Sequence, residues 1–253
     1  KSMIQKVWRA DSMDIRRRCV TIVPRRKKQS VDLVPSSRDT MQKSYLQQQE
    51  IWRTIAPVLL KQYKRDKTFL DYRNPWELLV AVILSAQTTD ELVNKITPEL
   101  FKKYPTPQVM AKASVVEIQP YVQKVNYFRM KAGYLKKTAE LLVKEFGGEV
   151  PLDIDKLQTL SGVGRKTAIA VMTNLVDTPY GIPVDTHVIR FVKRFSLTKA
   201  TDASKIEQDL LQIIPKKDWK RAGYAIKEYG RKEGRARGYK PEEDPIWKVY
   251  KNT

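Results

Sequence analysis

Along most of the chain, apolar side chains recur every three or four positions, which is the spacing of one face of an α-helix. The pattern becomes helical at Met41, and its first long series lies within residues 51–63. The apolar members of that series are Ile51, Trp52, Ile55, Val58, Leu59 and Tyr63. Because the only β-prone run outside helical patterns is Cys19–Val23, the sequence predicts a mainly α fold.

Several predicted helices have recognisable ends. Asn74-Pro75-Trp76-Glu77 supplies an N-cap, a proline at the first helical position and an acidic residue at the third. Thr88–Glu91 and Ser114–Glu117 each have the pattern of a capping box. A long helix is predicted over Phe128–Phe146, and Gly147-Gly148 should end it.

More helices are predicted toward the C-terminus. Two of them, Asp153–Leu160 and Thr167–Leu175, are joined by a short turn, and another should begin after Asp185. Two further helices are expected near residues 203–214 and 218–229. The tail Pro241–Tyr250 has apolar residues at helical spacing, so we expect it to pack back on the body of the protein. Those tail residues are Ile246, Trp247 and Tyr250.

The short turn contains Gly162, Val163 and Gly164. The two glycines lack a Cβ, so the backbone can bend sharply there and come close to another molecule. Unpaired N–H groups at the start of the next helix suit a phosphate. Lys166 follows in the first turn of that helix, and Asp185 comes later in the chain. This pattern is typical of a helix-hairpin-helix that grips a DNA strand, with an amine and a carboxylate beside it.

The charge balance points to a polyanionic partner. The chain has 48 Lys and Arg against 28 Asp and Glu, a net charge of +20. A surplus of this size is typical of nucleic-acid-binding proteins, although a merely soluble or ribosome-like basic protein shares it. Residues 1–40 are especially basic, and they form either a solvated tail or an arm that docks on the body or follows phosphates. No apolar run approaches the length of a membrane span.

Taken together, these segments resemble the endonuclease III-type DNA glycosylases of the helix-hairpin-helix (HhH-GPD) superfamily. The likeness extends from about Tyr45 to Tyr239 and is carried by several motifs in the expected order. They are Leu84–Asp90, Gly147–Pro151, the glycine hairpin and Pro183–His187. The resemblance implies a bifunctional enzyme of base excision repair that removes damaged, oxidised pyrimidines and nicks the strand at the abasic site. Double-stranded DNA with damaged bases or abasic sites would be its partner.

The resemblance also implies a domain organisation. Residues 1–43 would be a basic extension, and residues 44–67 together with 179–253 a terminal helical lobe. Residues 68–178 would be a helical barrel lobe, with the helix-hairpin-helix at 154–176. DNA would lie across the cleft between the two lobes. We expect a monomer that acts inside the cell, wherever the DNA is.

By the same resemblance, Lys166 is the nucleophile and Asp185 the catalytic carboxylate. An unprotonated Lys166 amine would attack the sugar C1′, displace the base and leave a Schiff base. Asp185 would stabilise the positive charge that develops at C1′. Taken alone, Asp185 is also a good helix N-cap, and both roles are compatible.

Other positions are expected to contact DNA. Gly162, Val163 and Gly164 would offer main-chain N–H groups to a phosphate, and Arg165 would add supporting charge. Flipping a nucleotide out of the duplex leaves a gap that must be filled. By resemblance, Gln87 fills that gap, Tyr127 is the wedge, and His187 lies beside the site. The wedge segment reads Asn126-Tyr127-Phe128-Arg129, where relatives usually have Gly-Leu/Phe-Tyr-Asn.

Cofactor expectations follow from the single cysteine, Cys19. Many relatives carry a four-cysteine iron–sulfur loop near the C-terminus, but residues 230–239 contain no cysteine. We therefore expect no iron–sulfur cluster and no metal in the chemistry, although hairpin carbonyls suit a monovalent cation. Our hypothesis is that the basic arm and the Trp247/Tyr250 tail replace the bracing role of the cluster.

Two other functions remain open from the sequence. The same catalytic pair would serve a glycosylase that removes thymine or uracil from mismatches with guanine. A non-catalytic helix-hairpin-helix DNA-binding module is the other alternative, and the missing cluster cysteines favour it. The presence of both Lys166 and Asp185 argues against that module.

Overall fold

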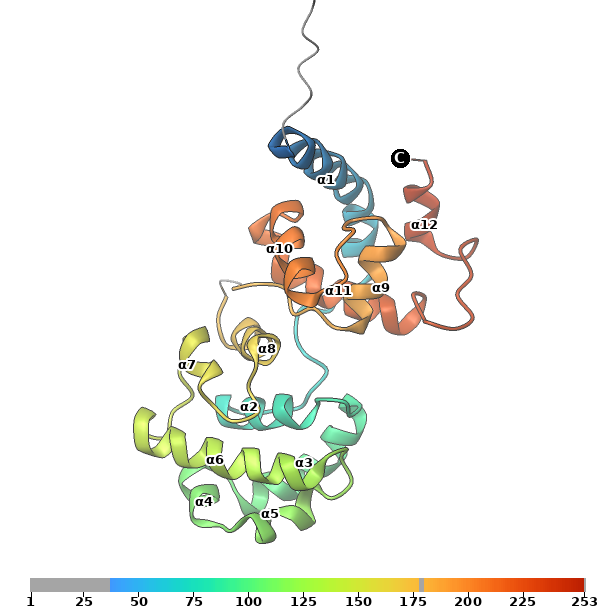
Figure 1. Cartoon of the computed structure of the whole chain (residues 1–253). Coiled ribbons are helices and arrows are strands. Elements are labelled where there is room, and N and C mark those ends of the chain that lie inside the picture. Colours follow the sequence, from blue (N-terminus) through green and yellow to red (C-terminus); the bar gives the residue numbers. More distant parts are fainter. Residues whose placement is uncertain (1–36, 178–179, 253) are drawn as a thin grey trace, which may run out of the picture. The chain divides into compact units, whose positions relative to one another are not determined.

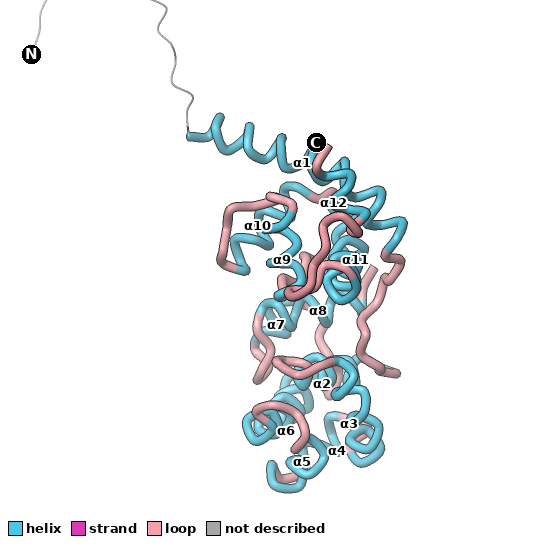
Figure 2. Tube along the Cα trace, turned by 90° about the vertical axis from the view of Figure 1, so that its right-hand side faces the viewer, coloured by secondary structure: helices cyan, strands magenta, loops and turns pink. Residues whose placement is uncertain are grey.

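A computed structural model describes residues 37–177 and 180–252, and within them every regular element is a helix. The prediction of a mainly α fold is confirmed, and Figures 1 and 2 show helices joined by loops. The helices up to the glycine hairpin are α1 (Ser37–Gln62), α2 (Pro75–Leu84), α3 (Asp90–Lys103), α4 (Pro107–Lys112), α5 (Val115–Val122), α6 (Phe128–Phe146) and α7 (Ile154–Gln158). After the hairpin come α8 (Arg165–Leu175), α9 (Thr186–Arg194), α10 (Ala203–Ile213), η1 (Lys216–Asp218), α11 (Trp219–Lys232) and α12 (Pro245–Tyr250).

Most helix ends lie where the sequence placed them. The Asn74 side chain accepts a hydrogen bond from the Glu77 N–H, and Ser114 and Glu117 form a reciprocal capping box. The prediction of a capping box at Thr88–Glu91 is wrong. The N-cap of α3 is Thr89, whose hydroxyl accepts from the Leu92 N–H, so no acidic side chain occupies the third helical position.

Some boundaries differ from the predicted ones. Helix α4, capped by Thr106, was not predicted because six residues give too short a periodic pattern. Helix α1 begins at Ser37, before the lobe start expected at residue 44. The predicted strand Cys19–Val23 and most of the basic arm lie outside the described residues.

Two separate hydrophobic cores organise residues 37–252. The first is built by side chains between Leu70 and Met172, from helices α2 to α8. The second combines α1 with the helices after Gly181, so that Ile55 and Leu59 pack with side chains such as Phe191 and Ile226. Figure 1 shows α1 beside α9 to α12, while α2 to α6 gather around the other core.

Charged side chains join the two sets of helices. Asp90, at the start of α3, pairs with Lys227 (3.2 Å) and Arg231 of α11. On the side of the second core, Arg221 of α11 donates to the carbonyls of Tyr63 and Arg65, where the chain leaves α1 toward the first core, at 2.7 and 2.9 Å. These contacts set the geometry of the space between the two cores.

The C-terminal tail packs back on the second core, as predicted. The carboxylate of Asp244 is buried and accepts hydrogen bonds from the hydroxyls of Tyr229 (2.5 Å) and Tyr239 (2.6 Å). The rings of Trp247 and Tyr250 lie against Phe195, with centroids 6.2 and 5.4 Å away. The tail is therefore fixed by a buried carboxylate and an aromatic cluster.

Candidate functional site

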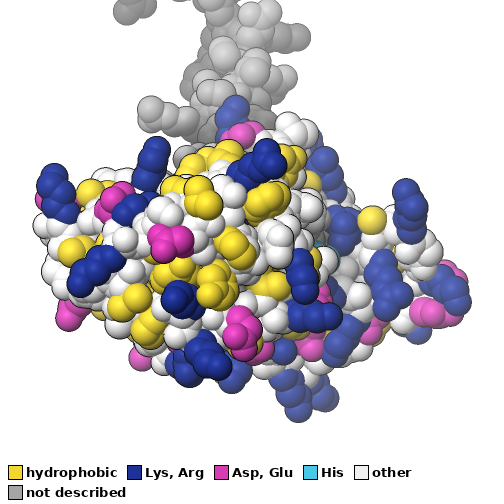
Figure 3. All heavy atoms as spheres, turned by 90° about the horizontal axis from the view of Figure 1, so that it is seen from below, with side chains coloured by type: hydrophobic (Ala, Val, Ile, Leu, Met, Phe, Trp, Pro, Cys, Tyr) yellow, Lys and Arg dark blue, Asp and Glu magenta, His cyan; other side chains and the backbone are white. Residues whose placement is uncertain are grey.

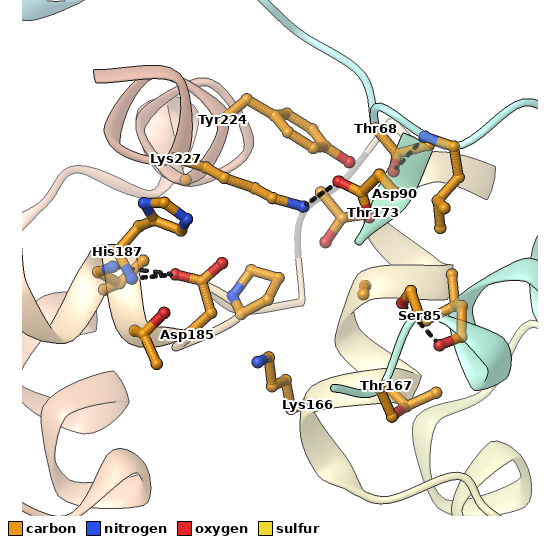
Figure 4. A pocket seen from close by; sticks show the side chains of 18 of the residues that line it. Thr68, Ser85, Asp90, Lys166, Thr167, Thr173, Asp185, His187, Tyr224 and Lys227 are labelled. Atoms are coloured by element: carbon orange, nitrogen blue, oxygen red, sulfur yellow. Dashed lines mark hydrogen bonds and ion pairs between the residues drawn. The ribbon is translucent and has the colours of Figure 1, made fainter. Parts of the chain in front are cut away.

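A pocket of about 830 Å³ lies between the two cores. It is lined by α8, by the start of α9, by α11 and by the loop between α2 and α3. Among the residues expected to act on DNA, the pocket brings together Gln87, Lys166, Asp185 and His187. Figure 4 shows the Lys166 amine and the Asp185 carboxylate projecting into the same space from different helices.

Lys166 occupies the first turn of α8. Its side chain is exposed to the pocket, and Gly164 is the N-cap of the helix in an extended conformation. The fold thus places this amine beside the start of α8, open to the pocket.

Asp185 is the N-cap of α9. Its Oδ1 accepts hydrogen bonds from the N–H groups of His187 (2.8 Å) and Val188 (3.0 Å). These bonds fix the position of the carboxylate. The cap uses Oδ1, so Oδ2 of the same carboxylate is available to face a ligand in the pocket. The capping role and the chemical role are therefore compatible in one rigid group.

His187 is held by its neighbours. Its Nδ1 lies 3.1 Å from Arg190 Nη2, and a Cβ added at Gly230 would lie 2.5 Å from the same nitrogen. Burial lowers the pKa of His187, and the Arg190 charge acts in the same direction against the opposing influence of Asp185. This ring packs α9 against α11 and is neutral near pH 7.

The glycine hairpin has the expected local geometry. Gly162 has a φ of +79°, and a Cβ there would lie 2.7 Å from the Tyr134 ring, so only glycine fits. Val163 is buried, and its N–H donates to the Leu160 carbonyl at 3.1 Å. Nothing lies within 4 Å of a Cβ at Gly164, so another molecule can approach the backbone there.

Some backbone polar groups of the hairpin are used within the protein, and others remain open to a ligand. The Val163 N–H is used inside the turn, and the Ser161 carbonyl accepts a hydrogen bond from the Thr138 hydroxyl at 2.9 Å. The groups open to an anion are consequently the first N–H groups of α8, next to Gly164.

Arg165 makes a contact that the sequence did not reveal. Its Nε and Nη2 donate to the two carboxylate oxygens of Glu207, each at 2.9 Å. Glu207 belongs to α10 and is buried, so the pair joins the hairpin to the second core. The support of a phosphate by Arg165 stays a prediction, and in the structure its guanidinium pairs with Glu207.

Gln87 and Tyr127 share an uncommon backbone conformation. Their φ values are 54° and 58°, in the left-handed region that non-glycine residues seldom adopt. Gln87 is exposed and lines the pocket, whereas Tyr127 does not line it and is 59% exposed at the start of α6. The side chain of Asn126 donates to the Gln87 carbonyl and so connects the two segments.

Two residues near the pocket were not identified from the sequence. Tyr224 of α11 lines the pocket, and burial raises the pKa of its phenol, which keeps it protonated as a hydrogen-bond donor. Lys131 is buried on the inner face of α6. A signal for Lys131 did exist, because it falls at helical spacing with the apolar positions Phe128 and Leu135.

The residues present do not fit a four-cysteine iron–sulfur cluster. The chain has one cysteine in total, and the segment that would carry the cluster is held by Tyr229, Tyr239 and Asp244. Arg194 completes this network by donating to the Tyr229 hydroxyl (2.8 Å) and lying 3.4 Å from the centre of the Tyr239 ring. The tail part of the bracing hypothesis thus has a structural counterpart, while the basic arm lies outside the described residues.

The exposed basic side chains are in line with the net charge of +20. Figure 3 shows lysine and arginine side chains at many points of the visible face, around a central area where hydrophobic side chains gather. Within the described residues, no helix has the length and apolar character needed to cross a membrane.

Comparisons with known proteins agree with this geometry. The model of the HhH-GPD superfamily base excision DNA repair proteins matches residues 80–216. Endonuclease III of Synechocystis sp. is 44% identical over 177 residues, covering 70% of this chain and 81% of the relative. Endonuclease III of Bacillus subtilis is 38% identical over 178 residues, with the same coverage. A solved structure of a trapped endonuclease III–DNA covalent intermediate matches with a TM-score of 0.75 at 36% identity, covering 80% of this chain and 94% of the other.

Proposed function

Because the chain belongs to the HhH-GPD superfamily of base excision DNA repair proteins, we propose that it is a DNA glycosylase and abasic-site lyase that removes oxidised pyrimidines. The observation that carries the assignment of roles is the meeting of Lys166 and Asp185 in one pocket, next to the glycine hairpin. A nucleotide flipped from the duplex would enter this pocket while the N–H groups at the start of α8 hold its strand.

In the proposed reaction, the lone pair of the Lys166 amine forms a bond to C1′ of the flipped nucleotide. The glycosidic C1′–N bond breaks, and the departing base takes its electrons and a proton. Asp185 stabilises the positive charge at C1′ during this step, because its carboxylate is fixed beforehand by the α9 N–H groups. The C1′–O4′ bond of the sugar then breaks, O4′ takes the bonding electrons and the second proton of the nitrogen, and a Schiff base joins Lys166 to C1′.

Strand cleavage follows from the Schiff base. The C2′ proton is removed because the imine acidifies it, a double bond forms between C2′ and C3′, and the C3′–O bond breaks with its electrons leaving on the phosphate. Water then hydrolyses the imine and frees Lys166. The residues described here supply the amine and the carboxylate for these steps, and we propose that no iron–sulfur cluster or metal takes part. We also propose that the protein acts as a monomer.

Borohydride trapping on a duplex with one abasic site tests this function. Reduction of the Schiff base should link the wild-type protein covalently to DNA, and Lys166→Ala should abolish the link. Lys144→Ala, which changes an exposed lysine of α6, is the matched control and should trap like the wild type. Asp185→Asn should reduce base release by at least about 100-fold, since it removes a charge placed at the reacting carbon.

The possible outcomes separate the alternative functions. A wild type that binds the duplex but forms no adduct would refute the lyase. Base release without trapping would leave a monofunctional glycosylase, and neither reaction would leave a DNA-binding module. A panel of duplexes with oxidised pyrimidines, or with thymine or uracil opposite guanine, would then identify the preferred base.

A further inference from the structure

Hydrogen bonds within the loop between α2 and α3, and from the loop to the end of α2, fold this loop into a tight turn. The Ser85 hydroxyl donates to the Val82 carbonyl at 2.8 Å, and the Thr88 N–H donates to the Ser85 carbonyl at 3.1 Å. At the tip of this turn, Gln87 has its left-handed backbone and an exposed side chain at the pocket. Such a conformation persists only where neighbouring groups impose it.

Lys131 is the main group that imposes it. Its Nζ donates to the carbonyls of Leu84 (2.8 Å) and Ala86 (2.6 Å) and to the Thr88 hydroxyl (3.1 Å), and its side chain is only 3% exposed. An ammonium ion has three donors, and these three acceptors use all of them. Among the residues that the structure describes, these partners include no carboxylate, so the loop and the end of α2 stabilise the buried charge.

Side chains on both sides of Tyr127 reach the Gln87 loop. Tyr127 is the N-cap of α6, and its carbonyl accepts the first main-chain hydrogen bond of that helix from the Lys131 N–H at 3.0 Å. The Asn126 side chain, on the other side of Tyr127, donates to the Gln87 carbonyl. Two residues that bracket Tyr127 therefore bond to the loop that carries Gln87. Asn126 occupies the position where the related motif usually has glycine, which has no side chain to make this bond.

We propose that Asn126 and Lys131 are positioning residues that lock the Gln87 loop and the Tyr127 turn into one unit, which enters the duplex as the nucleotide leaves it. This inference rests on the proposed function and assigns two different roles within it. Gln87 and Tyr127 would touch the bases, while Asn126 and Lys131 fix both backbones before DNA arrives. A preorganised unit avoids the cost of ordering two loops during nucleotide flipping.

The test compares two substrates that differ in how much flipping they need. One duplex carries an oxidised pyrimidine paired with a purine, and the other carries an abasic site with no base to unpair or unstack. Lys131→Met should lower the single-turnover rate of base excision by about tenfold or more, because the paired base must be flipped out of the duplex. Borohydride trapping at the abasic site should change by less than about threefold, because flipping costs least where pairing is already lost.

Matched variants separate positioning from simple instability. Lys137→Met changes an exposed lysine on the same helix and should leave both reactions unchanged. Asn126→Ala, at an exposed position, serves as a second test should Lys131→Met fold poorly, and it should show the same substrate difference with a smaller size. Fluorescence of 2-aminopurine placed next to the lesion reports insertion directly, and both variants should show a reduced rise on binding.

A double-mutant cycle measures the coupling itself. In the otherwise native protein, the combined effect of Gln87→Ala and Tyr127→Ala on insertion should differ from the product of the single effects by at least about threefold. In the Lys131→Met background, the combined effect should equal that product.

Several results would overturn the proposal. Equal losses on both substrates would mean a general structural role, and unchanged excision with unchanged fluorescence would mean no role in flipping. A wild type that inserts into DNA but neither excises nor traps would instead refute the proposed function. The proposal on Asn126 and Lys131 could still be tested in that case, because the fluorescence measurement needs only DNA binding.

Discussion

The buried carboxylate of Asp244 should be the main attachment of the C-terminal tail in a protein without cluster cysteines. Its Oδ2 accepts from two tyrosine hydroxyls, and its Oδ1 caps α12 by accepting from the N–H groups of Ile246 (2.8 Å) and Trp247 (3.2 Å). Asp244→Ala removes all four bonds at once. It thus tests whether this network fixes the segment that follows α11.

The size of the effect follows from those contacts. A hydrogen bond to a charged group contributes about 1.5–3 kcal/mol, and an N-cap contributes about 1 kcal/mol. The loss is smaller than their sum because Tyr229 keeps its bond to Arg194 and Tyr239 can reach water. Removing a buried charge also recovers part of its desolvation cost. We expect the free energy of unfolding to fall by about 3–4 kcal/mol, which lowers Tm by roughly 6–16 °C for a domain of this size.

Thermal unfolding followed by circular dichroism at the helix band measures this shift. Glu243→Ala is the matched control, since it changes the neighbouring carboxylate, which is 65% exposed and pairs with Lys240. An exposed pair of this kind contributes about 0–1 kcal/mol. If Asp244→Ala and Glu243→Ala shift Tm by the same small amount, the network does not hold the tail and the reasoning fails.

Three further predictions concern packing and charge. Gly230→Ala should lower the free energy of unfolding, measured by urea titration, by about 1–3 kcal/mol, because the new methyl group would overlap the His187 ring. An unchanged urea midpoint would show that the ring moves freely. Arg165→Ala should destabilise the protein through the unpaired Glu207 carboxylate and leave the salt dependence of DNA affinity nearly unchanged, whereas a slope shallower by about 0.9 would show a phosphate contact. Burial lowers the pKa of Lys131 from 10.5 to about 8, so above pH 8 the folded protein loses this proton before the unfolded chain does. Stability should therefore rise between pH 8 and 10.5 by up to about 3 kcal/mol relative to Lys131→Met, and parallel pH profiles of the two proteins would contradict this.

The sequence alone was sufficient for features set by neighbouring residues. Helix α6 lies over Phe128–Phe146 as predicted, because a periodic apolar face and the following glycines mark it locally. Asp185 caps α9 as its sequence context indicated, and the hairpin glycines have the geometry that their missing Cβ atoms permit. Lys166 lies in the first turn of α8 for the same local reason.

Only the tertiary structure decided which polar groups are partners. Arg165 bonds to Glu207 of α10, and Lys131 turns inward to the loop that carries Gln87. The carboxylate of Asp244 meets Tyr229 from the preceding helix. Helical periodicity says which face of a helix is buried, but it does not say which distant segment covers that face. Buried polar groups must find hydrogen-bond partners wherever the packing places them, so these pairings depend on the assembled fold.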